Sequence, residues 1–278
     1  MCQVLKVSRS GFYSWARRGP SRRTTYNRQI VDELTQMQSD TKQCYYGSPR
    51  AAAELRRQGY RVSRPRVARL MKAHGLRARR RRSYKRTTQS NHHLPVATHW
   101  LNRHFSPDQL NQVWAGDITY IRTMEGWMYL SVVMDLADRQ VIGWAVSEAM
   151  NADQTSISAW RQAIAARGGD GPALFHSDQG AQYSCQDFVA ELADAGNVCQ
   201  SMARKGNCWD NAVVESFFKT LKNEIDADRV FASRAQARLA VFDYIECWYN
   251  RHRLHSALEY RTPTEQEQWL RRQQQIAA

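Results

Sequence analysis

Three consecutive β-rich runs open the second part of this chain, and short strands alternating with helices follow them. The runs cover residues 112–121, 127–135 and 139–147, with turn signals at Glu125-Gly126 and Ala137-Asp138 between them. Shorter strands are predicted at 173–177 and 198–202, and helices over 152–167, over 184–195 and after Asp210, the expected N-cap. This order predicts an α/β fold in which helices cover both faces of a mixed sheet.

The part before residue 105 has a helical pattern instead, and it holds most of the positive charge. It carries 24 Lys and Arg against 4 Asp and Glu, whereas the whole chain of 278 residues has a net charge of +14. A polyanion is therefore the expected partner, and nucleic acid is favoured over lipid because no membrane-spanning or membrane-seeking segment is evident. We expect a cytoplasmic, nucleoid-associated protein whose six scattered cysteines are reduced.

Helix signals divide this basic part into three segments. Residues 1–26 are expected to form a partial helix-turn-helix-like segment, because what precedes the turn at Val7-Ser8 is too short for a partner helix. Residues 27–76 are expected to form a helix-turn-helix-like DNA-binding domain. Its helices are predicted over 27–40, from the Ser48-Pro49 cap to Gly59, and from Ser63 to Gly75. Residues 77–104 are predicted to be a basic linker.

The third helix is expected to show its basic side chains to solvent, and the expected phosphate contacts of this part are these side chains and those of the linker. They are Arg64, Arg66, Arg69, Lys72, Arg79, Arg80, Arg81 and Arg82. If eight phosphates are neutralised, the logarithm of the DNA affinity should fall against the logarithm of the salt concentration with a slope of about −7. The alternative is a small helical bundle whose basic face is merely solvated.

Three acidic residues lie where the predicted elements of the second part would converge. Asp117 falls inside a predicted strand, where aspartate is disfavoured, Asp178 follows the end of another, and Glu215 lies on a helix. Taken alone, each has an ordinary explanation as a turn, capping or helix-surface residue. Three carboxylates about 5 Å apart would repel by roughly 3 kcal/mol per pair at an effective dielectric near 20, so they require cations. Oxygen ligands select two magnesium ions, for which manganese can substitute, and such a pair serves phosphodiester chemistry.

Several phrases of the sequence closely resemble the transposases of the insertion-sequence three family, specifically the product of their second reading frame. They are GDITYI, HSDQGAQYS, RKGNCWDNAVVESFFKTLKNE and YNRHRLHSALEYRTP, and the N-terminal phrases VSRSGFYSW and YYGSPRAAAELRRQGYRVSRPRVARLMKAHGL are also similar. The resemblance covers nearly the whole chain and places it in the DDE transposase and retroviral integrase superfamily.

The resemblance implies a ribonuclease H-like integrase catalytic core over residues 105–228 and a C-terminal helical extension of it over 229–278. It implies that Asp117, Asp178 and Glu215 are the catalytic, metal-binding residues and that Lys222 holds DNA near them. Lys219 and Lys205 are further expected DNA contacts. The implied partners are double-stranded DNA, as element ends and as target, further copies of the chain on that DNA, and the upstream reading frame's product, either separate or as a frameshift fusion.

Two features depart from the family pattern. Asp178 and Glu215 are separated by 36 residues, one more than is usual, and Gln179 stands where the family usually has arginine. The expected activity is cleavage of element ends and DNA strand transfer. The alternatives are a structure-selective nuclease of the same fold and a catalytically inactive DNA-binding regulator.

Other polar residues of the second part have simpler expected roles. Asp135, Asp138 and Glu224 are expected in turns or on the surface, without a metal. His176 is expected to orient the Asp178 loop, to contact DNA, or simply to pack in the core.

Overall fold

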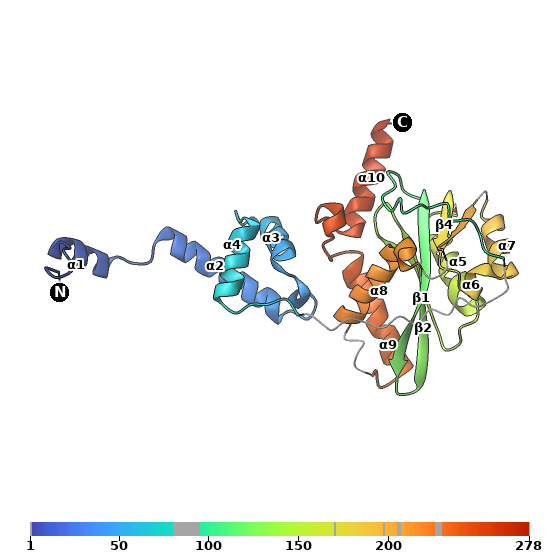
Figure 1. The fold of residues 1–278 in the computed structure, drawn as a ribbon, viewed down its shortest axis with the longest axis horizontal. Coiled ribbons are helices and arrows are strands. Elements are labelled where there is room, and N and C mark those ends of the chain that lie inside the picture. The colour runs from blue at the N-terminus through green and yellow to red at the C-terminus, as the bar shows by residue number, and fades with distance from the viewer. Residues whose placement is uncertain are drawn as a thin grey trace. The chain divides into compact units, whose positions relative to one another are not determined.

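The computed structural model describes residues 2–79, 95–169, 171–196, 198–204, 207–225 and 230–277. The chain forms two compact units, a helical unit over Met1–Arg79 and an α/β unit over Arg80–Ala278 (Figure 1). None of the helices in the described ranges has the length and apolar character needed to cross a membrane.

The helical unit is built from four α-helices and a short 3-10 turn. These are α1 (Arg9–Arg17), α2 (Arg22–Ser39), η1 (Gln43–Tyr45), α3 (Ser48–Arg57) and α4 (Arg64–Ala73). Apolar side chains of α2, α3 and α4, among them Ile30, Leu55 and Val67, form its core. The three helices predicted between residues 27 and 75 are therefore confirmed.

The ends of these helices differ in detail from the prediction. Ser21 caps α2 by accepting a hydrogen bond from the backbone N–H of Thr24, so the predicted boundary at residue 26 lies inside this helix. Gly47, rather than Ser48, occupies the N-cap of α3. Ser63 caps α4 as predicted, and Gly59 takes the left-handed conformation (φ 90°) in the turn that joins α3 to α4.

The α/β unit is organised around one sheet of five strands. They are β1 (Val113–Thr123), β2 (Gly126–Asp135), β3 (Val141–Ser147), β4 (Leu174–Ser177) and β5 (Cys199–Met202). Their order across the sheet is β3-β2-β1-β4-β5, with β1, β2 and β3 antiparallel and β4 and β5 parallel to β1. The mixed sheet is confirmed, and the architecture is ribonuclease H-like, as the resemblance implies.

Helices follow the strands in the predicted order, with two breaks in regularity. A π-helical turn, η2 (Asp153–Ile157), leads into α5 (Ser158–Ala166), and extended backbone at Cys185 splits the next helix into α6 (Ala181–Ser184) and α7 (Gln186–Asp194). The remaining elements are η3 (Cys208–Asn211), α8 (Ala212–Glu224), α9 (Arg234–Phe242), η4 (Asp243–Tyr249), η5 (Ser256–Leu258) and α10 (Pro263–Ala277).

Two hydrophobic cores lie on opposite faces of the sheet. Alternation along the strands sends Val132 into the core under α8 and α9 and Val133 into the core under α5, α6 and α7. These helices flank the sheet on its two sides (Figure 1). Gly143 permits the close approach of α5, because a Cβ at this position would collide with the backbone oxygen of Ala159.

The C-terminal segment, which runs from α9 to α10, contributes to the core on the α8 side of the sheet. Tyr244, Ile245 and Tyr249 of η4 are buried beside the residues of α8. The start of α10 has a capping box, since Thr262 N–H donates to the Glu265 carboxylate and Glu265 N–H donates to the Thr262 hydroxyl.

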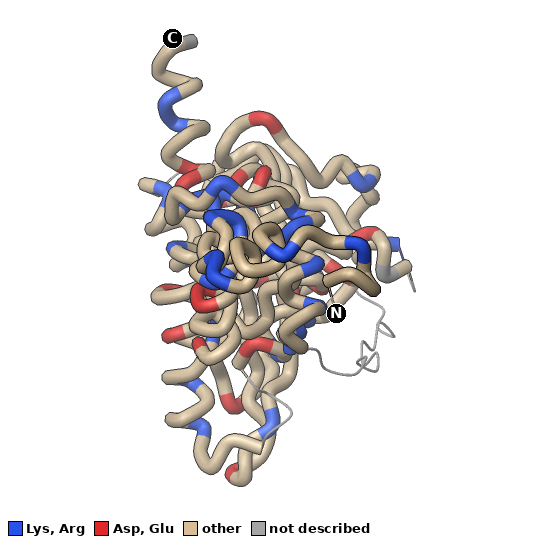
Figure 2. The backbone as a smooth tube through the Cα atoms, turned by 90° about the vertical axis from the view of Figure 1, so that its left-hand side faces the viewer, with Lys and Arg blue, Asp and Glu red and all other residues tan. Residues whose placement is uncertain are grey.

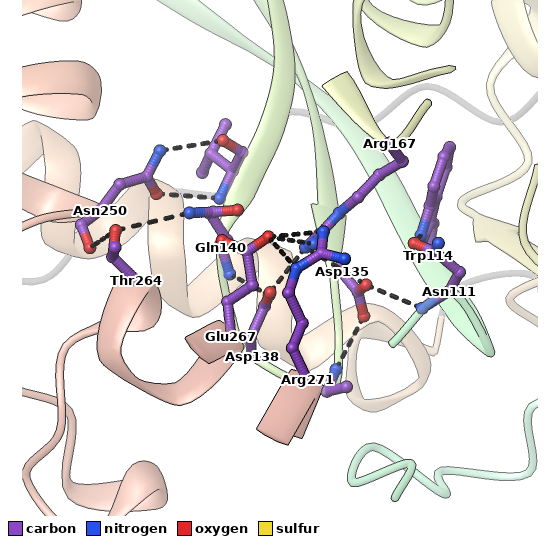
Figure 3. A network of polar contacts seen from close by, with 12 residues as sticks. Asn111, Trp114, Asp135, Asp138, Gln140, Arg167, Asn250, Thr264, Glu267 and Arg271 are labelled. Carbon is purple, nitrogen blue, oxygen red and sulfur yellow. Dashed lines mark hydrogen bonds and ion pairs between the residues drawn. The ribbon is translucent and has the colours of Figure 1, made fainter. Parts of the chain in front are cut away.

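Asp135 and Asp138 lie at the turn that ends β2, as expected, but they are buried there rather than on the surface, and Arg167 compensates their charge. Arg167, at the end of α5, donates to Asp138 at 2.6 Å and lies 3.4 Å from Asp135 and 2.9 Å from Glu267 of α10 (Figure 3). Burial and the neighbouring charge of Asp135 raise the pKa of Asp138 to about 7, while Arg167 opposes this shift. The surface role predicted for these acids is therefore wrong.

Glu224, the last residue of α8, is held in the same manner. Arg253 donates to both of its carboxylate oxygens, with Nη2 at 2.8 Å from Oε1, and the Tyr244 hydroxyl donates to Oε2 at 2.9 Å. All three residues are buried. The C-terminal segment thus fixes the far end of α8.

Replacing Arg167 by methionine should lower the free energy of unfolding by about 3–5 kcal/mol at neutral pH, because two buried carboxylates lose their cation. Removing Arg167 should raise the pKa of Asp138 further, so the part of the loss that comes from Asp138 should shrink as the pH falls from alkaline values toward about 7 and stay constant below it, where Asp138 is protonated in both proteins. Urea unfolding at pH 6, 7, 8 and 9 measures both effects.

Arg161→Met is the matched control, because Arg161 pairs with Glu191 at the surface and its side chain is 61% exposed. Its effect should stay within about 1 kcal/mol at every pH. Equal losses in the two variants would contradict the buried-charge account.

Candidate active site

The pairing of β1 with β4 brings the first two predicted acids together. Ala115 of β1 lies opposite His176 of β4 in a parallel register. Continuing this register by two residues brings Asp178 beside Asp117, and neighbouring strands lie about 4.8 Å apart. Asp178 comes directly after the last residue of β4, where its Oδ1 accepts a hydrogen bond from Gly180 N–H at 2.9 Å.

The start of α8 is attached to β1 next to Asp117. The side-chain amide of Asn211, the N-cap residue, donates to the backbone oxygen of Gly116 at 3.3 Å. Glu215 follows Asn211 by four residues and so lies on the same face of the helix. The helix therefore presents Glu215 toward the part of the sheet that carries Asp117.

Electrostatic effects on Asp117 agree with this placement. Burial raises the pKa of Asp117 well above its usual range, and the negative charges of Asp178 and Glu215 raise it further. A hydrogen bond from the Ile118 N–H at 2.8 Å and the charge of Lys222 act in the opposite direction. Burial also raises the pKa of Tyr183, and the charges of Asp117 and Asp178 add to that shift.

The structure thus brings Asp178, Glu215 and Lys222 within electrostatic range of Asp117. Asp117 and Asp178 are half-buried and Glu215 is exposed, so the group lies at the solvent edge of the sheet. Within the described ranges, no three Asp, Glu, His or Cys side chains are grouped closely enough to hold a metal ion as they lie. Carboxylates are nevertheless the ligands that hard divalent cations prefer. A cation bound among them would offset the repulsion that Asp178 and Glu215 exert on the charge of Asp117.

One of the two departures from the family pattern, Gln179, lies beside this group. The Gln179 side chain donates from Nε2 to the backbone oxygen of Ala203 at 3.0 Å, which joins the Asp178 loop to the end of β5. Gly196, in the turn between α7 and β5, has the left-handed conformation (φ 100°) and belongs to the 36 residues that separate Asp178 from Glu215.

Sequence reasoning missed the role of Asp210, which lies immediately before α8. The carboxylate accepts from Arg204 Nε at 2.8 Å and from Arg103 Nε at 2.9 Å, and its side chain is fully buried. Hydrogen bonds from Arg204, and then from Arg103, hold its pKa well below the usual range. Asp210 is therefore not the N-cap of α8, and the prediction of that role is wrong.

His176 is buried and packs in the core, which is one of the three roles expected for it. Its Nδ1 lies 3.0 Å from the hydroxyl of Ser201, and its ring packs edge-on against His99. Burial, assisted by His99, lowers its pKa to about 4, so the imidazole is neutral at pH 7.

The basic residues predicted to bind DNA have different surroundings. Those that are exposed are Arg64, Arg69, Lys72 and Arg79 in the helical unit and Lys219 on α8. Figure 2 marks the lysines and arginines along the backbone. Arg80, Arg81, Arg82 and Lys205 lie outside the described residues.

Arg66 was predicted to face solvent, but it is half-buried and engaged within the helical unit. Its Nη2 donates to the Asn27 side chain at 2.7 Å, and its guanidinium lies 5.0 Å from the centre of the Tyr26 ring. These contacts join α4 to α2. The prediction that Arg66 is displayed to solvent is therefore wrong.

Comparison with known proteins identifies relatives for both units. Two models described as integrase core domain match residues 107–208 and 197–263, and one described as HTH-like domain matches residues 27–84. The transposase InsF for insertion sequence IS3A of Escherichia coli (strain K12) is 43% identical over 92% of this chain and 88% of its own length. An uncharacterized 31 kDa protein of insertion element IS600 from Shigella sonnei is 40% identical over 93% of this chain and 94% of its own length.

A solved structure of the HTLV-2 integrase catalytic core domain in complex with magnesium is also similar. It shares 19% identity with this chain, with a TM-score of 0.42, over 57% of this chain and 97% of that one.

The two arginines of α4 should respond differently to replacement by alanine. Arg69→Ala should make the log–log salt slope of DNA binding shallower by about 1, because one phosphate contact is lost, and leave stability unchanged. Arg66→Ala should instead lower the free energy of unfolding by about 0.5–1.5 kcal/mol, because the half-buried side chain of Asn27 loses its donors.

Fluorescence anisotropy of labelled duplex DNA at several salt concentrations gives the slope, and urea unfolding followed by circular dichroism gives the stability. If Arg69→Ala destabilises the chain as much as Arg66→Ala does, the assignment of Arg69 to a DNA-binding face is wrong.

Proposed function

We propose that this chain, which belongs to the insertion-sequence transposases of the IS3 family, cleaves the ends of its element and joins them to another DNA by two-metal phosphodiester chemistry. The family assignment supports a role in DNA transposition, and an integrase core indicates a polynucleotidyl transferase. The proposal extends this to the chemical steps and to the residues that perform them.

One observation carries the assignment of the residues. The other buried acids of the core described above are compensated by arginine: Asp135 and Asp138 by Arg167, Asp210 by Arg103 and Arg204, and Glu224 by Arg253. For Asp117, by contrast, the charge with the largest effect on its pKa is the carboxylate of Asp178, and Glu215 acts in the same sense. A bound cation would stabilise such a group of neighbouring carboxylates.

In this proposal Asp117, Asp178 and Glu215 hold two magnesium ions, or manganese in their place. Bound ions of this kind supply a polarised phosphodiester and an activated water or 3′-hydroxyl. Lys222 lies close enough to act on the charge of Asp117, and we assign it to the phosphate of the DNA end. The exposed arginines and lysine of α4 hold the duplex through its phosphates.

The assembly implied by this function contains more than one chain. Two element ends have to meet for transposition, so we propose that several copies assemble on double-stranded DNA. The product of the upstream reading frame, separate or as a frameshift fusion, is the proposed source of end recognition. The proposed location is the nucleoid.

Asp117→Asn, Asp178→Asn and Glu215→Gln should each lower DNA joining by about a hundredfold or more, which corresponds to about 3 kcal/mol of transition-state stabilisation. The assay incubates the chain with magnesium and a labelled duplex that carries an end of its own element, and resolves cleaved and joined strands on a denaturing gel. Asp187→Asn, an exposed acid in the first turn of α7, is the matched control and should retain the activity.

The products distinguish the candidate functions. Joined strands that disappear in the three variants and persist in the control support the transposase. Cleavage without joining, in the presence of the upstream product, supports a structure-selective nuclease instead. DNA binding with neither product under the same conditions supports a regulator and contradicts catalysis by these acids.

A further inference from the structure

Two segments far apart in the sequence are fastened together just before α8. Arg103 and Arg204 both donate to the buried carboxylate of Asp210, at 2.9 and 2.8 Å between the nearest atoms. The first segment is also attached to β5, because the backbone N–H groups of Trp100 and Leu101 donate to the Ser201 hydroxyl at 3.0 and 3.2 Å. The backbone of both segments is therefore held by buried polar contacts.

Each of these fixed segments nevertheless exposes a tryptophan. Trp209, next to Asp210, is 68% exposed, and Trp100 is 59% exposed, whereas Trp114 and Trp160 of the same unit are fully buried. Tryptophan carries a large apolar surface and is highly buried on average in folded proteins. Two exposed indoles on segments that are held in this way therefore indicate a binding surface rather than incomplete packing.

The same segments supply positive charge. The side chains of Arg103 and Arg204 are 45% and 58% exposed, although each contacts Asp210. Two guanidinium groups against one carboxylate leave a net positive charge beside the tryptophans. We call Trp100, Arg103, Arg204 and Trp209 the tryptophan surface.

The chemistry of the tryptophan surface fits a single-stranded polyanion. Aromatic rings on which bases stack, combined with cations that attract the backbone, are the shared features of sites for unpaired nucleic acid. A duplex fits less well, because its bases are stacked on one another and offer no free faces. Aromatic residues and arginine are also enriched at protein interfaces, so a protein partner is the alternative that an experiment has to exclude.

We propose that the tryptophan surface binds unpaired bases at the end of the DNA, next to the acids that act on it. The inference rests on the proposed function, because α8 begins two residues after Asp210 and carries Glu215. Bases released from the duplex at the reacting end would stack on Trp209 and Trp100. A DNA end that is already unpaired should therefore bind more tightly than a fully paired one.

The test measures the affinity of the full chain for two labelled duplexes of equal length that differ only at one end. One end is fully paired, and the other has three mismatched base pairs. Fluorescence anisotropy with a chelator present gives both dissociation constants without catalysis, and their ratio is the preference for an unpaired end. The ratio removes the contribution of the helical unit, which both duplexes share.

Trp209→Ala and Trp100→Ala should each reduce this preference by about fivefold or more, as expected from the loss of one base-stacking contact. Trp209→Phe should keep it within about twofold, since an aromatic face remains. Trp127→Ala is the matched control, because Trp127 is 53% exposed on β2 and is not part of the tryptophan surface. Circular dichroism checks that each variant is folded.

A native chain with no preference, or alanine variants that keep it, would overturn the proposal. A change of oligomeric state in Trp209→Ala with an unchanged preference would assign the surface to a protein partner and overturn it as well. A different outcome would contradict the proposed function while leaving this inference intact. If no DNA joining is found but the preference depends on Trp209, the surface binds unpaired DNA and the transferase assignment is lost.

Discussion

The parallel pairing of β1 with β4 is the constraint on which the candidate site depends. β1 is the central strand, and it is antiparallel to β2 on one side and parallel to β4 on the other. This pairing sets Asp178, just beyond the end of β4, beside Asp117 in the middle of β1. A shift of the register by one residue would turn one of the two side chains to the opposite face of the sheet. The position of Asp117 is thus a property of the sheet, and that of Asp178 is set by the strand that it directly follows.

The third acid depends on how α8 is held, since a helix can slide or rotate on a sheet. Three contacts fix it: Asn211 donates to Gly116 of β1, Asp210 is bound by two arginines, and Glu224 is bound by Arg253 of the C-terminal segment. The first two act at its start and the third at its end. The C-terminal segment is accordingly a structural part of the catalytic unit, because the far end of the helix that carries Glu215 depends on it.

Much of this arrangement could be predicted from the sequence, and the failures share a physical cause. Alternation of apolar residues and turn signals located the strands, and Asp117 was conspicuous because aspartate is rare within a strand. Asp210 looked like a helix cap, since the sequence next to it gives no sign of Arg103, which lies 107 residues away. Arg66 looked solvent-exposed because the sequence around it gives no sign of Asn27 and Tyr26, which lie on another helix. Local patterns report local preferences, whereas a buried ion pair is decided by tertiary contacts.

The acids of the α/β unit differ in their neighbours. Those that stabilise the fold are paired with arginine, whereas the group proposed to bind a cation consists of carboxylates. Bringing a carboxylate out of water is costly, and a neighbouring guanidinium offsets the cost, as Arg167, Arg253 and Arg204 do for their partners. Asp117 is partly withdrawn from water and has carboxylates as neighbours, which increases the cost of its charge. Folding alone does not explain a group of like charges, because burying a leucine at one of these positions would cost less free energy. Such a group persists in a sequence when binding a cation, and the DNA that comes with it, outweighs the loss of stability.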